Sequence, residues 1–281
     1  MPGTLYVVAT PIGNLEDVTL RALRVLREVA LIAAEDTRRT SRLLQHYSIS
    51  TPTTSLHEHN EGAKTPGLVQ RLRDGESIAL VSDAGTPVVS DPGSLLVAAA
   101  HAAGLRVEPI PGASAAMAAV SASGFGGDQF VFLGFPPARP QARRKWLRTL
   151  ANETRPLVVY EAPHRIRDTL GDMLSVLGDR TVAVGRELTK LHEELVVRPI
   201  SSYLQDFQAP RGEYTIVLAP PEPAQSQADT PSSEELTAEF GHLTEIDQLG
   251  RRQAIQQLAA KYGLSSRAVY SMIEAGRRCV D

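Results

Sequence analysis

Three short loops of small side chains are the parts of this chain best suited to chemistry. The central one lies in residues 77–93, SIALVSDAGTPVVSDPG, where an apolar run leads into Ser82-Asp83-Ala84-Gly85-Thr86-Pro87. Similar loops occupy residues 10–14, TPIGN, and residues 109–115, PIPGASA. Glycine lets a backbone approach a ligand closely, and ligands in open α/β sheets bind where strands end. The loops predict a site that holds a small organic ligand largely through backbone.

An acidic and basic cluster, Glu35-Asp36-Thr37-Arg38-Arg39, follows another short apolar run. A carboxylate at a strand end can bind a hydroxyl group or accept its proton. Asp36 or Thr37 could equally cap a helix that begins here. Both interpretations remain open from the residues alone.

His57-Glu58-His59-Asn60-Glu61 combines side chains that can bind metal. The spacing is not HExxH, and adjacent loop residues seldom ligate one ion together. The other interpretations are a loop facing the substrate, with His57 and Asn60 forming hydrogen bonds, and a loop that is simply solvated.

A basic segment at residues 138–148, ARPQARRKWLR, contains no acidic residue. Such a segment can contact phosphates, or it can be a solvated helix face with Trp146 packed inward. In YEAPHR, residues 160–165, Glu161 is a further polar group beside a strand end, as is Glu187 after Arg186. These carboxylates could instead be buried partners of Arg165 or Arg186.

Alternating strand and helix patterns position these groups in an α/β fold. A parallel sheet covered by helices is predicted for residues 1–124, and a second α/β domain for residues 125–220, after a break at Gly124-Phe125-Gly126-Gly127. A proline-containing linker is predicted at 221–233, and helices at 234–243, 247–262 and 266–274 form a small module over 234–281.

The expected elements follow from apolar periodicity and from turn residues. Strands are expected at 4–9, 30–34, 77–81, 106–110, 130–135, 156–160, 181–184 and 214–218. Helices are expected at 18–29, 40–47, 67–73, 94–103, 114–122, 143–150, 164–177 and 202–207.

Bulk composition restricts the class of protein. The 281 residues are 42% hydrophobic and 22% charged, without an apolar run of the roughly 20 residues that a membrane span needs. The single cysteine, Cys279, excludes a disulfide framework and a cysteine-based zinc site, and a cytoplasmic location is expected. Because the net charge is −3, any nucleic-acid binding must rest on local basic segments.

Common nucleotide motifs are absent. The first loop reads TPIGNLED, which matches neither the GxGxxG of a dinucleotide-binding fold nor the glycine-rich turn of common methyltransferases, and the chain holds no GxxxxGK[ST] run.

A series of motifs in order carries a family resemblance. In chain order, from residue 10 to residue 190, the motifs are TPIGNLED, AAEDTRRT, HEHNE, LVSDAGTPVVSDPG, PGASA, YEAPHR and GRELTK, and the resemblance that they carry covers about residues 3–220. The series resembles the ribosomal RNA small subunit methyltransferase I family of the tetrapyrrole methylase superfamily, and the tail resembles that family's helix-turn-helix-like module. The resemblance implies S-adenosylmethionine bound between two α/β domains. It also implies 2′-O-methylation of a cytidine ribose in the decoding region of 16S rRNA or the 30S subunit, without a metal, by a homodimer active in ribosome biogenesis.

Site residues follow from the same resemblance. The implied donor contacts are Pro11, Ile12, Gly13, Asp83, Ala84, Gly85, Thr86, Val89, Ser114, Ala115, Tyr160, Glu161 and Leu188. The expected RNA contacts are Arg38, His57, Asn60, Arg143, Arg144, Lys145 and Arg165. Asp36, Glu58 and Glu187 are the candidate bases for the ribose hydroxyl.

Two other classes share the expected donor pocket. One is a small-molecule methyltransferase acting on a tetrapyrrole, of the cobalamin or siroheme type, and the other is a regulator that only senses the cofactor. The basic segment at 139–148 and the basic tail from Gln248 to Arg278 favour RNA, because a porphyrin-sized substrate needs neither.

Overall fold

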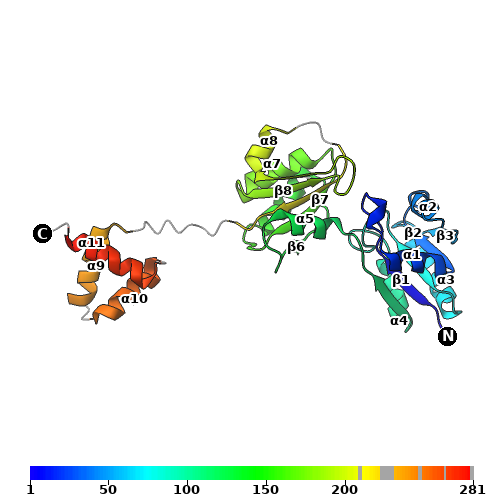
Figure 1. The fold of residues 1–281 in the computed structure, drawn as a ribbon, viewed down its shortest axis with the longest axis horizontal. Helices are drawn as coiled ribbons and strands as arrows, with labels where there is room; N and C mark the ends of the chain where they lie inside the picture. Colours follow the sequence, from blue (N-terminus) through cyan, green and yellow to red (C-terminus); the bar gives the residue numbers. More distant parts are fainter. Residues whose placement is uncertain (208–210, 222–230, 246–248, 263, 279–281) are drawn as a thin grey trace. The chain divides into compact units, whose positions relative to one another are not determined.

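The computed structural model describes residues 1–207, 211–221, 231–245, 249–262 and 264–278. The chain divides into two compact units, Met1–Pro220 and Pro221–Asp281 (Figure 1). Most of the expected linker at 221–233 lies outside the described residues, as do Gly263 and Cys279.

The first sheet is parallel and has the strand order β3-β2-β4-β1-β5. Its two inner strands β2 and β4 have the sequences LIAA and IALV and are buried at every position, as short apolar runs in parallel sheets usually are. The bounds are β1 Thr4–Val8, β2 Leu31–Ala34, β3 Thr53–Ser55, β4 Ile78–Val81 and β5 Arg106–Ile110.

Helices cover both faces of this sheet. On one face α1 (Leu20–Glu28) and α2 (Thr37–His46) bury Leu26 and Leu43 against Val8 and Ile32. On the other, α3 (Glu61–Arg73) and α4 (Ser94–Ala102) bury apolar side chains against Leu5 and Leu80. The helices that follow β1 and β4 therefore lie on opposite faces of the sheet, although these two strands are neighbours. The loops after the two strands diverge there and border a crevice suited to ligands.

The second sheet is mixed, with the order β6-β7-β10-β8-β9. Only β6 and β7 pair in parallel, while β7, β10, β8 and β9 pair antiparallel. The strands are β6 Val131–Phe132, β7 Leu157–Glu161, β8 Thr181–Arg186, β9 Glu194–Pro199 and β10 Tyr214–Leu218. The helices α6 Pro140–Thr149, α7 Ile166–Leu177 and α8 Ile200–Gln205 share its larger core.

Helix α5 (Ala115–Ser123) packs on the second sheet, although its sequence continues from the first domain. Ala116, Ala119 and Val120 form a core with Val158 and Val217, and α5 lies beside β6 and β7 in Figure 1. The chain therefore leaves the first sheet between β5 and α5, earlier than the boundary expected at residue 124. The PGASA loop is the connection between the two sheets.

The second unit contains α9 (Ser233–Glu245), α10 (Arg251–Tyr262) and α11 (Ser266–Arg278). Leu236, Phe240 and Leu258 belong to its own core. A capping box begins α9, because Ser232 Oγ accepts a hydrogen bond from the Glu235 amide and the Glu235 carboxylate accepts one from the Ser232 amide. This unit thus has its own hydrophobic core.

The α/β class with two α/β domains and C-terminal helices is confirmed, with local differences. The expected helix at 67–73 begins earlier, at Glu61, and contains Pro66. Strands β3 and β9 were missed, since both are half-exposed and lack a long apolar run. In the described ranges, no helix is both long and apolar enough to cross a membrane.

Candidate functional site

A cavity of about 440 Å³ opens beside the carboxyl ends of β1 and β4 and is lined by loops of both sheets. A volume of this size suits a small organic ligand. Most of the residues expected to contact the donor line it: Ile12, Asp83, Ala84, Gly85, Thr86, Val89, Ser114, Ala115, Tyr160, Glu161 and Leu188. The loops after β1, β4 and β5, which are distant in sequence, therefore meet at one site.

Backbone hydrogen bonds join the loops after β1 and β4. The Thr10 amide donates to the Gly85 carbonyl over 2.8 Å, and the Gly85 amide donates to the Thr10 carbonyl over 3.0 Å. The Thr86 hydroxyl donates to the Ala113 carbonyl of the third loop. Gly85 has φ +81°, and a Cβ there would lie 3.3 Å from Ile12 Cγ2, so the central loop requires glycine at this position.

The first loop also contacts the loop after β8. The Asn14 amide donates to Thr189 Oγ1 over 2.9 Å, and a Cβ on Gly13 would lie 2.4 Å from Lys190 Cγ. Pro11 and Gly13 do not line the main cavity. They line a second hollow of about 370 Å³ that shares Ile12 with the first.

Two cavity residues sit between residues of unusual backbone conformation. Val89 lies between Val88 (φ +74°) and Ser90 (φ +67°), and Leu188 lies between Glu187 (φ +51°) and Thr189 (φ +66°). Positive φ costs energy in residues other than glycine and often marks ligand-binding loops. The neighbours of Val89 and Leu188 therefore adopt the unusual conformation, while the Val89 and Leu188 side chains line the cavity.

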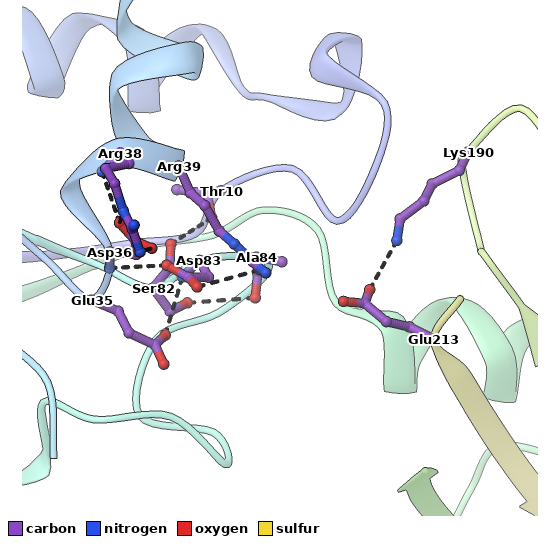
Figure 2. Close-up of polar contacts among 10 residues, drawn as sticks. All are labelled: Thr10, Glu35, Asp36, Arg38, Arg39, Ser82, Asp83, Ala84, Lys190 and Glu213. Carbon is purple, nitrogen blue, oxygen red and sulfur yellow. Dashed lines mark hydrogen bonds and ion pairs between the residues drawn. The ribbon is translucent and has the colours of Figure 1, made fainter. Parts of the chain in front are cut away.

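The carboxylates of Glu35, Asp83 and Asp91 and the guanidinium of Arg39 line the cavity from the first domain. Figure 2 shows Glu35, Asp83 and Arg39. The Asp83 amide donates to Glu35 Oε2, the Asp83 carboxylate accepts from the Asp36 amide, and Asp83 Oδ2 lies 3.3 Å from Arg39 Nη1. Burial raises the pKa of Glu35 and of Asp83, in the latter case against the lowering effect of Arg39. Burial and the nearby Glu35 carboxylate raise the pKa of Asp91 to about 6.

None of the expected bases lines the cavity. Asp36 is the N-cap of α2: Oδ1 accepts the Arg38 amide over 2.9 Å, and the Arg38 guanidinium binds the same carboxylate. These bonds from Arg38 lower the pKa of Asp36 to about 2. The helix-cap interpretation is confirmed for Asp36, and Glu58 is exposed on the loop before α3.

Glu187 is a structural carboxylate next to Leu188. Burial would raise its pKa, but hydrogen bonds from the Lys190 ammonium and the Glu213 amide outweigh burial and lower it. Lys190 also pairs with the Glu213 carboxylate at 3.0 Å. Glu187 therefore braces the loop after β8 and is not placed to accept a proton in the cavity.

Glu161 is nearly inaccessible, with 1% of its surface exposed. Its carboxylate accepts hydrogen bonds from the Ala162 amide and the Thr169 hydroxyl and pairs with Arg165. Arg165 in turn donates to the Pro136 carbonyl. The expectation of an RNA contact at Arg165 is corrected: its guanidinium holds Glu161 and the loop after β6, as in the alternative interpretation.

The His57–Asn60 loop is held by its own side chains. The His57 amide donates to Asn60 Oδ1 over 2.9 Å, and Asn60 Nδ2 lies 2.9 Å from His57 Nε2. Neither residue lines the main cavity. Within the described part of the chain, no group of three or more histidine, cysteine, aspartate or glutamate side chains could hold a metal ion.

The basic segment forms α6, and its cations differ in exposure. The Arg143 side chain is 2% exposed and binds Asp172 at 2.7 Å, so the expected phosphate contact at Arg143 is wrong because that group is buried and neutralised. Arg144 also contacts Asp172 but is partly exposed, and Lys145 is exposed. Trp146 packs toward the core of the second domain.

Sequence reasoning missed several cavity residues. Glu35 and Arg39 belong to the AAEDTRRT motif, but the sequence predicts functional roles only for their neighbours Asp36 and Arg38. Asp91 lies in the second turn of the opening motif, and its SDPG pattern could have identified it. Ser90 lies in the same SDPG turn, Ala162 and Pro163 lie in YEAPHR, and Lys190 ends GRELTK, so these motifs could also have identified them. No motif in the sequence analysis includes the other cavity residues: Phe135, Glu213, Tyr214 and Thr215.

Comparison with known proteins decides the family. The model of the family described as Tetrapyrrole (Corrin/Porphyrin) Methylases matches residues 4–203. The chain belongs to this family. Its fold resembles that of uroporphyrin III C-methyl transferase from Thermus thermophilus, with a TM-score of 0.57 and 19% identity, over 77% of this chain and 97% of that one.

Sequence relatives are more similar. A protein of Synechocystis sp. named ribosomal RNA small subunit methyltransferase I is 46% identical over 96% of this chain and 97% of its own length. A Thermotoga maritima protein of the same name is 47% identical over 98% of its length but only 77% of this chain. The family match at 4–203 lies in the first unit, and the match to the Thermotoga relative extends over 219 residues.

Proposed function

We propose that the chain is an S-adenosylmethionine-dependent methyltransferase that modifies the small-subunit ribosomal RNA at a cytidine ribose 2′-oxygen. The observation that carries this proposal is 46% identity to a protein named ribosomal RNA small subunit methyltransferase I, across 96% of this chain. The cavity between the loops of the two sheets supports it independently, because it lies where open α/β sheets bind ligands.

The cavity suits the methyl donor. S-adenosylmethionine supplies, when bound, an electrophilic methyl group on a positively charged sulfur. Glu35, Asp83 and Asp91 give one wall a negative character, which favours a cationic ligand in a partly desolvated site. Apolar walls from Ile12, Val89 and other side chains, with the small residues Ala84, Gly85, Ser114 and Ala115, complete a narrow slot.

The protein's own contribution to methyl transfer is position. The donor is already activated, so catalysis depends on holding the acceptor oxygen in line with the methyl carbon. The paired loops at Thr10 and Gly85 fix one side of the slot, and the loop at 187–190 fixes the other.

Exposed cations supply the RNA-facing surface in this proposal. Arg38 is 89% exposed, and Arg144 and Lys145 of α6 are accessible. Phosphate contacts of this kind give RNA affinity that does not depend on sequence. The C-terminal unit adds exposed Arg252 and Arg267. A cytoplasmic homodimer acting on 16S rRNA or the 30S subunit is part of the same proposal.

Methyl transfer from labelled S-adenosylmethionine tests the proposal. The protein is incubated with 16S rRNA, with 30S subunits lacking the modification, and separately with a tetrapyrrole acceptor. Label in RNA is the expected result. Label only in the tetrapyrrole would favour the small-molecule alternative, and label in neither acceptor would favour a cofactor-sensing regulator.

A further inference from the structure

A second hollow adjoins the main cavity on the side of the first domain. Its volume is about 370 Å³, and α2 and the loops after β1 and β4 contribute most of its lining. The two hollows have these residues in common: Ile12, Arg39, Asp83, Ala84, Lys190 and Glu213. A group bound in the second hollow would therefore lie next to these six residues, which also border the first hollow.

The second hollow combines cations with an apolar floor. Arg39 and Arg42 project from α2, and Pro11, Leu15 and Leu43 supply apolar surface. Arg42 is exposed and has no hydrogen-bond or ion-pair partner among the residues that the structure describes. A guanidinium beside an apolar surface suits a nucleotide, because the cation can bind the phosphate while the surface receives the base or ribose.

Asp83 is the carboxylate best placed between the hollows. Glu213 also lines both, but its side chain is 67% exposed and is paired with Lys190. Only 22% of the Asp83 side chain is exposed, with Oδ1 held by the Asp36 amide and Oδ2 3.3 Å from Arg39. In Figure 2 the Asp83 carboxylate and the Arg39 guanidinium lie together, apart from the Lys190–Glu213 pair.

We propose that the second hollow is the acceptor subsite, which takes a phosphodiester-linked ribonucleotide, and that Asp83 accepts the proton of its ribose hydroxyl. The inference rests on the proposed function and identifies the acceptor's place in it. The ribose oxygen bonds to the methyl carbon as the carbon–sulfur bond breaks. The electron pair of that bond stays on sulfur, and the hydroxyl proton passes to the Asp83 carboxylate. Arg39 holds Asp83 in position, and Arg42 binds a phosphate.

The first test measures RNA binding by the full-length protein. Arg42→Gln should lower the affinity for 16S rRNA and reduce the slope of log affinity against log salt by about 0.7 to 1, the value for one phosphate contact. Arg73→Gln is the matched control. Arg73 is exposed at the end of α3. The neighbouring Leu72 carbonyl accepts the Gly3 amide just before β1 begins, so Arg73 lies near the amino end of β1, away from the hollows at its carboxyl end.

The second test separates catalysis from binding. Asp83→Asn should lower kcat by about 10²–10⁴-fold, the usual contribution of a general base. Its affinities for 16S rRNA and for S-adenosylhomocysteine, which lacks the positive sulfur, should stay at the wild-type values. Calorimetry and single-turnover kinetics measure these quantities.

The outcomes distinguish the two proposals. If the wild-type protein transfers no methyl group to RNA, the proposed function fails. If the wild type is active and Arg42→Gln keeps the wild-type salt slope, the acceptor subsite is overturned. If Asp83→Asn keeps the wild-type kcat, Asp83 is not the proton acceptor.

Discussion

Thr10 and Gly85 exchange two backbone hydrogen bonds, of 2.8 and 3.0 Å, although 75 positions separate them in the chain. The pair joins the loop after β1 to the loop after β4 at the point where these adjacent strands end. Both loops line the candidate donor site through Ile12 and Gly85. The geometry of the cavity therefore depends on backbone hydrogen bonds between the two loops, to which the Thr10 hydroxyl adds a bond to the Ser82 carbonyl.

Gly85→Ala is expected to weaken donor binding about tenfold, which corresponds to about 1.4 kcal/mol. The new Cβ would lie 3.3 Å from Ile12 Cγ2 in a residue with φ +81°, so the loop must shift to relieve strain. Isothermal titration calorimetry with S-adenosylmethionine measures the change.

Gly104→Ala is the control for backbone strain. Gly104 has φ +68°, but a Cβ there would meet no atom within 4 Å apart from its chain neighbours. Both variants should lose roughly 1–2 kcal/mol of stability, the cost of a left-handed residue with a Cβ. Only Gly85→Ala should lose donor affinity, and equal affinity in the two variants would contradict this role for the loop.

Arg143→Met is expected to lower the free energy of unfolding by about 3 kcal/mol. The substitution leaves the Asp172 carboxylate buried with only the more distant Arg144 contact, and broken buried pairs cost about 3–5 kcal/mol. Urea unfolding monitored by circular dichroism measures the change.

Lys145→Met is the matched variant on the same helix. Lys145 is exposed, so its loss should change stability by less than about 0.5 kcal/mol and should reduce RNA affinity. An unchanged stability in Arg143→Met would show that the Arg143–Asp172 pair does not support the fold.

Helix α6 shows where sequence reasoning reaches its limit. The basic composition of residues 138–148 correctly marks a helix with a charged face, and Trp146 correctly packs inward. The composition does not reveal that Asp172 approaches from α7 and removes Arg143 from the surface. Exposure of a charged residue depends on tertiary partners that are distant in sequence.

The candidate site, like α6, was predictable from the sequence only in part. Strand ends and turn residues predict the loops that line the cavity, because glycine permits backbone conformations that other residues avoid and proline fixes φ. The sequence predicts Asp36, and not Glu35, as a candidate base. In the structure Asp36 caps α2, and Glu35 lines the cavity. Adjacent residues at a strand end point in different directions, and only the fold determines which one enters the site.

Stability is expected to depend on pH through Asp91. Burial and the Glu35 carboxylate raise the pKa of Asp91 to about 6, above the value near 3.8 of an unfolded aspartate. Protonation therefore favours the folded state: the contribution is complete below about pH 4 and is lost as the pH rises through 6. The partners that face this carboxyl are Glu35 and Asp83, which raise its pKa, and Ser82, which lowers it.

Asp91→Asn removes this titration. At low pH the free energy of unfolding of the variant should equal that of the wild type. At pH 8 it should be higher by about 1 kcal/mol, after allowance for partial exposure of the carboxyl. Urea unfolding at several pH values measures the difference. A stability difference that does not vary with pH would refute the shifted titration.

Deletion of residues 234–281 is expected to leave donor binding intact and to weaken RNA binding. The helical unit has its own core, and the donor cavity lies wholly within residues 12–215. Loss of the exposed Arg252 and Arg267 should lower the salt slope by up to about 1.5 if both contact single-stranded RNA. Filter binding measures the slope, and an equal RNA affinity for the truncated protein would exclude a docking role.

The most direct measurement locates the transferred methyl group. 30S subunits that lack the modification are incubated with methyl-labelled S-adenosylmethionine and the full-length protein, and the purified 16S rRNA is hydrolysed in alkali. A 2′-O-methyl group blocks cleavage at the next phosphate, so the label should appear in an alkali-stable dinucleotide that begins with cytidine. Label in single nucleotides would place the methyl group on a base, and unlabelled RNA would show that the chain does not methylate this substrate; either result would contradict 2′-O-methylation by this protein.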